Sequence, residues 1–305
     1  DQILIFHHNL QINSLKILQC DFLDFFSSFC LSYWMDDLVA AYPKLVTKVQ
    51  IGTSYEGRPM YFSTGGNKRT AIWVDSRIHS REWVSQATGV WTANKIVTDY
   101  GTDASLTSLL NAMDIYLLIL TNPDGYVHSH TSDSMWCKTH SNNPGSIMCV
   151  SSSPCPSPGA ITNPCSDSYH GPSPRSEMEV RNVVNLVKNH SNFKSLIYIH
   201  AYSQLFQPPA RTGKHSTGVQ SNTFNKIICN NNHLLICDVS LHPDQASSGI
   251  IDWLYKLGMK YSFAFELRDI GCCGFIQPAN QIIPTASETW LGRKDIMVYV
   301  RDHPY

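Results

Sequence analysis

Short apolar runs alternate with longer amphipathic segments along most of this chain. A β-hairpin is predicted where residues 48–52 and 59–62 flank the polar turn at residues 54–57. Further strands are predicted at residues 70–75, 114–120, 196–202 and 262–267, and helices at residues 83–100, 176–190 and 287–303. Apolar strands that alternate with helices indicate an α/β fold whose sheet is buried on both faces.

The length of 305 residues fits one large α/β domain or two ordinary domains. Residues 35–305 carry the alternating pattern and are expected to form a single domain. Residues 1–34 are expected to be an atypical N-terminal segment. The apolar and aromatic residues 17–34 within it do not predict a membrane span, because Asp21 and Asp24 interrupt them. No basic stretch followed by an apolar one is visible, so the sequence shows no secretory signal.

The composition and net charge of the chain limit the kinds of partner that it is expected to bind. Hydrophobic residues make up 43% of the chain and charged residues 15%, an ordinary balance for a globular protein with a core. The formal net charge of −1 argues against nucleic acid or a membrane as a partner, because polyanions are not attracted to a nearly neutral surface.

His79 and Glu82 lie where the strand at residues 70–75 gives way to the helix at residues 83–100. An imidazole and a carboxylate three positions apart can face one metal ion, and His200, at the end of another predicted strand, is the best third ligand. Two nitrogens and one carboxylate, with a position left for water, are typical of hydrolytic zinc sites. The His-x-x-Glu pattern alone is equally compatible with a surface histidine beside a solvated glutamate.

Five motifs in a fixed order give the chain a specific resemblance. The segment 78–91 contains His79 and Glu82, and Asn-Pro-Asp-Gly occupies residues 122–125. The other three motifs are at residues 163–172, 263–269 and 282–290. Together they closely resemble the secreted zinc carboxypeptidases of the pancreatic A/B type, most of all the A branch, from about Leu38 to Tyr305.

The resemblance implies a single α/β catalytic domain with a mixed, eight-stranded twisted sheet and helices on both faces. It implies a secreted, monomeric metallocarboxypeptidase that uses one Zn²⁺ ion to hydrolyse C-terminal peptide bonds. The implied partners are peptide or protein C-termini, and its own pro-segment or a proteinaceous inhibitor.

The resemblance also assigns the chemistry to particular residues. His79, Glu82 and His200 match the family's zinc ligands, and Glu266 matches the carboxylate that takes a proton from the zinc-bound water. An acidic residue at the end of an apolar strand is also compatible with a structural ion pair, here between Glu266 and Arg268.

Four further residues match positions of the substrate groove. Arg81 matches an arginine that helps to polarise the peptide carbonyl, and Tyr202 lies just after His200, as in the family. Ile251 matches the pocket floor, where an aliphatic side chain favours aromatic or branched aliphatic terminal residues over Lys or Arg. Asp244 stands where the family has a mobile tyrosine, and its carboxylate would repel the carboxylate of the substrate.

Ten cysteines are many for a cytosolic protein and moderate for a secreted one. The resemblance implies one disulfide, between Cys149 and Cys165, within a long loop at residues 140–174. The competing interpretation is a zinc site made of Cys137, Cys149, Cys155 and Cys165, whose spacings do not form C-x-x-C pairs. Cys272 and Cys273 are adjacent and cannot easily pair with each other.

Departures from the family pattern predict a poor exopeptidase. Cys137 replaces the arginine that stabilises the oxyanion, and the segment between Cys149 and Cys165 has no arginine to clamp the terminal carboxylate. It also lacks the aspartate that orients the first zinc histidine. Two alternatives therefore stay open: a non-catalytic, zinc-binding relative, and an impaired translation product with an unusual start and a divergent stretch at residues 207–241.

Overall fold

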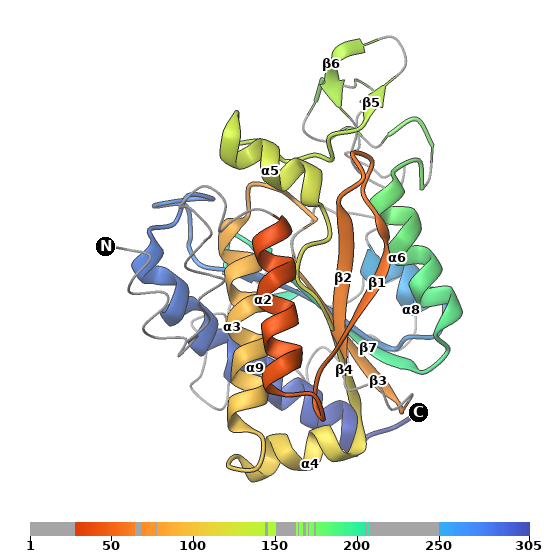
Figure 1. Cartoon of the computed structure of the whole chain (residues 1–305), viewed down its shortest axis with the longest axis vertical. Coiled ribbons are helices and arrows are strands. Elements are labelled where there is room, and N and C mark those ends of the chain that lie inside the picture. Colours follow the sequence, from red (N-terminus) through yellow and green to blue (C-terminus); the bar gives the residue numbers. More distant parts are fainter. Residues whose placement is uncertain are drawn as a thin grey trace, which may run out of the picture.

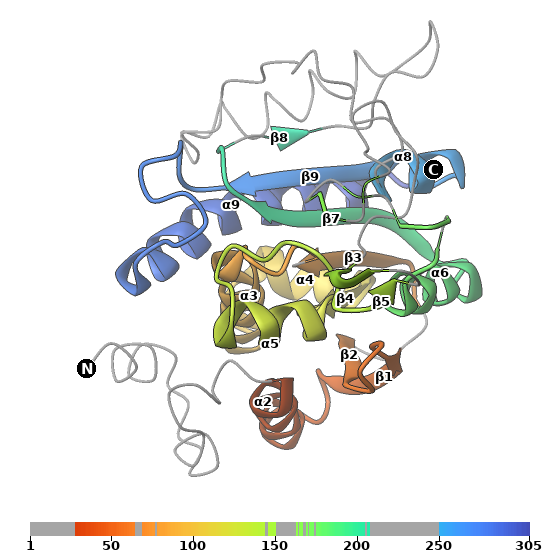
Figure 2. The same cartoon turned by 90° about the horizontal axis from the view of Figure 1, so that it is seen from above.

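The computed structural model describes residues 28–64, 69–76, 78–143, 146–150, 163, 165–166, 169, 171–173, 175–204, 206–207 and 250–305. A twisted, mixed sheet forms the middle layer, and helices cover both of its faces (Figures 1 and 2). The predicted α/β class is confirmed. Among the described residues, no helix is both long and apolar enough to cross a membrane.

The described strands of the main sheet are, in spatial order, β1 (Thr47–Thr53), β2 (Pro59–Thr64), β4 (Asp114–Leu118), β3 (Ala71–Ser76), β7 (Phe193–Ala201), β9 (Tyr261–Leu267) and β8 (Phe206–Gln207). Strands β4, β3, β7 and β9 are parallel neighbours, and antiparallel pairs complete the two edges. The expected count of eight strands is wrong for the described residues, which give seven. The last edge strand, β8, spans only two residues, and residues 208–249, which follow it, lie outside the described part of the chain.

Two further strands, β5 (Asn142–Asn143) and β6 (Ser146–Val150), pair with each other as a separate antiparallel sheet. They fall inside the segment predicted to be a long loop, which is therefore not wholly irregular. This small sheet projects beyond the carboxyl end of the main sheet, near the top of Figure 1.

Helices pack on the sheet in two groups. One face is covered by α2 (Ser28–Ala41), α3 (Trp83–Asp99), α4 (Ala104–Ala112) and α9 (Ile282–Asp302). The other face carries α6 (Met178–Asn189) and α8 (Ile250–Lys256). The helix α5 (Pro123–Thr131) follows β4, and the 3₁₀ turn η2 (Ala279–Gln281) leads into α9.

Alternation along the central strands explains why both faces are buried. In β7, Ile197 and Ile199 join the core under α3 and α9, whereas Leu196 and Tyr198 join the core under α6 and α8. Successive side chains of a strand point to opposite faces, so a strand covered on both sides must be apolar at every position. That requirement produces the continuous apolar runs seen in the sequence.

The N-terminal helix α2 crosses the boundary expected between residues 34 and 35. Trp34, Met35 and Leu38 are all buried in the core beneath this helix. Cys30 is also buried, and it is disulfide-bonded. The division into an atypical segment and a domain stays a prediction, but residues from Ser28 onward contribute to the same core as the sheet.

Candidate metal centre

The candidate chemistry lies at the carboxyl ends of β3 and β7, which are parallel neighbours in the sheet (Figure 2). His79 lies in the short connection after β3, and Glu82 is the N-cap residue of α3. His200 is the penultimate residue of β7. Parallel strands bring their carboxyl ends to one edge, and this edge is where α/β folds gather their ligands.

The three side chains converge on one point. The Nδ1 atoms of His79 and His200 are 3.2 Å apart, and Glu82 oxygens lie 2.6 Å from the first and 3.1 Å from the second. A tetrahedral zinc ion with ligands at ~2.1 Å would separate neighbouring ligand atoms by roughly 3.4 Å. The donor types and their spacing therefore fit a zinc ion.

Electrostatics favours a cation at this point. Glu82 is only 3% exposed, and desolvation alone would raise the pKa of its carboxyl group. The positive charges of His79 and His200, with their hydrogen bonds, outweigh that effect and lower the pKa of Glu82 to about 2. The buried carboxylate is therefore anionic at neutral pH and depends on a positive partner.

Glu266 lies beside this cluster, opposite His200 in the register of β7 and β9. Desolvation, together with the negative charge of Glu82, raises the pKa of Glu266 to about 8, although His200 acts in the opposite sense. Arg268 pairs with Glu288 and also donates to Gln281, so the alternative of a Glu266–Arg268 ion pair is not what the structure shows. A carboxyl group titrating near neutral pH suits a general base.

Comparison with known proteins agrees with this geometry. Residues 31–292 match the model of the zinc carboxypeptidase family. The chain belongs to the zinc carboxypeptidase family. Carboxypeptidase A2 of Mus musculus is 53% identical to it over 298 residues, with 89% of this chain and 69% of that protein covered. Carboxypeptidase A1 of Homo sapiens is 47% identical over 296 residues, with the same coverage.

Solved structures give the same result for the fold. The chain superposes on bovine thrombin-activatable fibrinolysis inhibitor, which was solved in complex with tick carboxypeptidase inhibitor. The TM-score is 0.78 at 32% identity, and 90% of this chain and 96% of that chain are covered. The family places the chain among metallocarboxypeptidases of the A branch that use one Zn²⁺ ion.

The motif Asn-Pro-Asp-Gly of this zinc carboxypeptidase relative holds the loop that carries His79. The Asn122 amide nitrogen donates to the carbonyls of Ile78 and Lys138 at 2.9 and 3.0 Å, and its oxygen accepts from Gly125 N. A Cβ atom at Gly125 would lie 2.3 Å from the Lys138 carbonyl oxygen. Only glycine permits this approach, which fixes the His79 loop against the segment around Lys138.

Arg81, Tyr202 and Phe275 form the side of the site nearest to solvent. The Arg81 guanidinium lies 4.2 Å from the ring centroid of Phe275, and its Nη1 donates to the Met135 carbonyl at 3.2 Å. Tyr202 meets Phe275 edge to face, with the centroids 4.8 Å apart. The substrate-groove roles of Arg81 and Tyr202 stay predictions. Phe275 was not predicted, and its only signal in the sequence is its position after the motif at residues 263–269.

Asp75, at the carboxyl end of β3, was also missed. It is fully buried and accepts a short hydrogen bond from the Thr121 hydroxyl. Desolvation raises the pKa of Asp75 to about 7, and the bond from Thr121 and the charge of His200 oppose that shift. A charged residue ending an otherwise apolar strand was the available signal.

The remaining predicted residues are only partly described. Ile251 lies in α8 and packs, partly buried, against the core under that helix. Asp244 and the side chain of Cys149 lie outside the described residues. Cys165 is disulfide-bonded. Its pairing with Cys149 stays a prediction, because the Cys149 side chain lies outside the described residues. The four-cysteine zinc site is wrong, because a sulfur atom in a disulfide is not a thiolate ligand.

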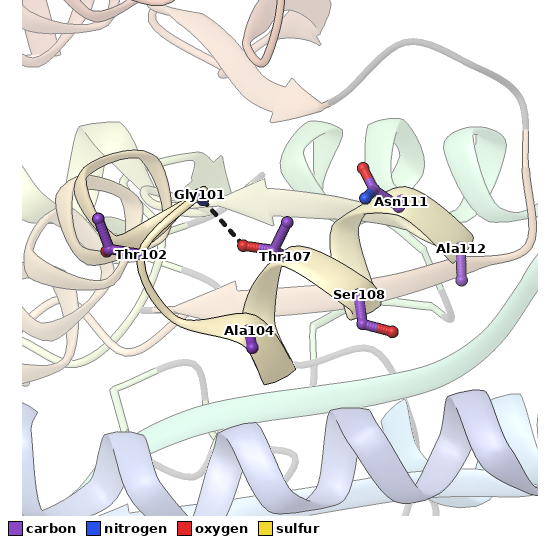
Figure 3. Close-up of a pocket in the computed structure, with 7 residues that line it drawn as sticks. All are labelled: Gly101, Thr102, Ala104, Thr107, Ser108, Asn111 and Ala112. Carbon is purple, nitrogen blue, oxygen red and sulfur yellow. Dashed lines mark hydrogen bonds between the residues drawn. The ribbon is translucent and has the colours of Figure 1, made fainter.

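A surface hollow beside α4 is unrelated to this chemistry (Figure 3). Its lining residues are Gly101, Thr102, Ala104, Thr107, Ser108, Asn111 and Ala112. None of them carries a titrating side chain, and the Thr107 hydroxyl already accepts from Gly101 N at 2.8 Å. Helix α4 leads into the amino end of β4, so this hollow lies away from the carboxyl edge of the sheet.

Proposed function

We propose that this chain hydrolyses C-terminal peptide bonds with the help of one zinc ion held by His79, Glu82 and His200. The observation that carries the proposal is the convergence of two Nδ1 atoms and a buried carboxylate beside Glu266. Bound zinc would acidify a water molecule and polarise the peptide carbonyl. The other steps belong to the side chains of the protein.

Glu266 is the proton carrier of this proposal. Its environment raises the pKa of the carboxyl group to about 8, so the protonated and ionised forms are both accessible near neutral pH. The ionised form accepts a proton from water, and the protonated form delivers it to the leaving amine. Arg81, held by Phe275 and the Met135 carbonyl, is placed to orient the peptide carbonyl.

Ile251 sets the specificity of the proposed enzyme. An aliphatic pocket floor accommodates an aromatic or branched aliphatic side chain and leaves a Lys or Arg ammonium or guanidinium without a partner. The ratio of kcat/KM for Phe-ending over Arg-ending substrates should therefore exceed one.

Turnover should nevertheless be slow. Cys137 is buried and carries no guanidinium, and the Lys138 ammonium lies 5.3 Å from the ring centroid of Trp136. Loss of one oxyanion donor typically lowers the rate by ~100- to 1,000-fold. Loss of a charge-assisted clamp on the terminal carboxylate removes on the order of 2–5 kcal/mol of binding.

The compartment and partners form part of the same proposal. We infer an extracellular protein, because Cys30 and Cys165 are both disulfide-bonded and disulfides persist in oxidising compartments. A monomer is proposed from the resemblance to the family alone. The solved complex of a relative with a tick carboxypeptidase inhibitor supports a proteinaceous inhibitor as a partner here, alongside peptide C-termini. A pro-segment of its own would occupy the same groove.

The second candidate is a non-catalytic protein that binds zinc and peptides. Cys137 favours it, because the buried thiol stands where the family has its oxyanion donor. Both candidates share the zinc centre and differ only in turnover.

One experiment separates the candidates. The full chain is purified with zinc present, its metal content is measured by mass spectrometry, and release of Phe or Arg from blocked dipeptides is followed. Stoichiometric zinc with slow, Phe-selective release supports the enzyme, and zinc without release above the Glu266→Gln variant supports the binding protein. Glu82→Gln should lose zinc, whereas the exposed His303→Gln should keep it. A folded chain without zinc contradicts both.

A further inference from the structure

A second group of metal-ligating side chains lies in the loop that follows β9. Asp269, Cys272 and Cys273 each offer one ligand atom, and these atoms lie within 4.8 Å of one another. Both cysteines carry free, exposed thiols. None of the three residues belongs to the zinc centre described above.

The backbone of the loop holds the carboxylate of Asp269 in place. Its Oδ1 accepts from Gly271 N at 2.7 Å and from Gly274 N at 3.3 Å, and its Oδ2 accepts from Cys273 N at 2.6 Å. A carboxylate has about four acceptor positions, so these bonds leave one. The Cys273 thiol also hydrogen-bonds to the Asp269 side chain.

The charges in the loop repel one another when the thiols ionise. Slight desolvation, the neighbouring Cys272 and the Asp269 carboxylate all raise the pKa of the Cys273 thiol. Desolvation would raise the pKa of Asp269, but the backbone N–H groups of Cys273, Gly271 and Gly274 together outweigh it and lower this pKa. The position of the carboxylate beside two thiols, with all three ligand atoms within 4.8 Å of one another, is the arrangement that a cation can bridge.

We propose that Asp269, Cys272 and Cys273 form a second metal site, which takes a thiolate-preferring divalent cation of the Zn²⁺ and Cd²⁺ class. Each thiol that binds the ion releases its proton to solvent, so two sulfur–hydrogen bonds are exchanged for two metal–sulfur bonds. The ion replaces the proton of the Cys273 thiol beside the Asp269 carboxylate. Two thiolates favour zinc and cadmium over Mg²⁺ or Ca²⁺, which prefer oxygen.

The site adjoins the groove of the proposed enzyme. Phe275, two residues beyond Cys273, packs against both Arg81 and Tyr202. A cross-link between Asp269 and the two sulfur atoms would stiffen the loop from which Phe275 projects. The loop also presents Ile270, whose side chain is 80% exposed and offers no metal ligand, which makes it a matched control position.

The test uses the full chain and Cd²⁺ alone. Cadmium bound by thiolates gives an ultraviolet charge-transfer band, which His79, Glu82 and His200 cannot produce because none is a thiol. The native chain and the Ile270→Ser variant should show a saturable band, with protons released as cadmium binds. The Cys272→Ser/Cys273→Ser variant should lose the corresponding part of the band while retaining cadmium at the histidine centre.

A second measurement needs no variant. Trypsin cleaves after Arg268 and Arg293, and the resulting peptide, residues 269–293, contains Cys272 and Cys273 and no other cysteine. Cadmium should protect this peptide from alkylation in the native chain. Full alkylation of both thiols at saturating cadmium, or a band of equal size in the double-serine variant, would overturn the proposal.

Discussion

Arg293 is a buried cation in the middle of α9, and its removal should stabilise the fold. The side chain is fully buried, and its guanidinium donates to Thr92 Oγ1 at 2.7 Å and to the carbonyls of Thr289 and Ala286 at 3.3 and 3.4 Å. A fourth, longer bond runs to Thr289 Oγ1 at 3.5 Å. All four acceptors are neutral. Desolvation lowers the pKa of Arg293 from 12.5 to about 9.

The size of the penalty follows from that shift. A displacement of 12.5 − 9, or about 3.5 pKa units, corresponds to roughly 5 kcal/mol at about 1.4 kcal/mol per unit. The three shorter hydrogen bonds to neutral oxygens return part of it, on the order of 1 kcal/mol each, and the bond at 3.5 Å adds little. Burial of the charge therefore costs about 2 kcal/mol in net terms, and Arg293→Met should raise the free energy of unfolding by roughly 1–3 kcal/mol.

The hydroxyl groups that Arg293 leaves behind keep other partners. Thr92 Oγ1 donates to the Thr88 carbonyl at 2.6 Å, and Thr289 Oγ1 donates to the Thr285 carbonyl at 2.8 Å. Methionine fills the space of the arginine stem without a charge and adapts its shape to the cavity. The substitution therefore removes a desolvated cation without creating an unsatisfied hydroxyl group.

The lowered pKa of Arg293 also predicts how the stability gain of Arg293→Met changes with pH. The folded pKa of about 9 lies below the unfolded value, so below pH 9 both states are protonated and the destabilisation is complete. Between about pH 9 and 12.5 the unfolded state binds more protons, and native stability rises with pH. The advantage of Arg293→Met, measured by urea unfolding, should shrink from about pH 7 to about pH 10. Arg301→Met is the control, because Arg301 lies in the last turn of the same helix, is only partly buried and is paired with Asp302. A variant less stable than the native chain at neutral pH refutes the reasoning.

Two further predictions concern the loops around the site. Gly125→Ala should lower stability by about 1–3 kcal/mol, because its Cβ would lie 2.3 Å from the Lys138 carbonyl oxygen; an unchanged midpoint of thermal unfolding would contradict the packing argument. Cys137→Arg alone should restore little activity, whereas the same change with Asp244→Tyr and the full family segment between Cys149 and Cys165 should raise kcat/KM by several orders of magnitude on a Phe-ending substrate. Equal kcat/KM for the unmodified chain and an ordinary family member would show that another group already fills these roles.

The central sheet was predictable because a strand buried on both faces is recognisable from its own run of apolar residues. Strands β3, β7 and β9 are covered on both faces, so each is a continuous apolar run that hydrophobicity alone identifies. Helix α5 leaves no such mark, since it has no apolar stripe and its buried residues are mostly small or polar. Helix α4 was not predicted, although its N-cap residue, Asp103, is a sequence signal for a helix start. In the structure the Asp103 side chain accepts from Leu106 N at 3.0 Å.

The candidate site also contains residues that the sequence was sufficient to predict and contacts that it was not. His79 and Glu82 are three residues apart, and His200 ends a predicted strand, so the rule that ligands gather at carboxyl ends was enough to bring them together. The contact of Arg81 with Phe275 joins positions almost two hundred residues apart in the sequence and depends on how two loops pack. No local pattern specifies such a contact.

The difference between groups held by the sheet and groups held by loops also explains how one chain can bind zinc and still turn over slowly. His200 is 7% exposed and lies on β7, the strand between β3 and β9, where it pairs in register with Glu266, so the sheet itself holds these two groups. In the sequence, the departures from the family at Cys137, between Cys149 and Cys165 and at Asp244 lie outside the residue ranges of β3, β7 and β9. Changes there leave the metal set intact while they remove groups that bind the substrate carboxylate and the oxyanion. Zinc content therefore reports on the three ligands and on the missing aspartate that would orient His79. Kinetics reports on the groups that bind the substrate.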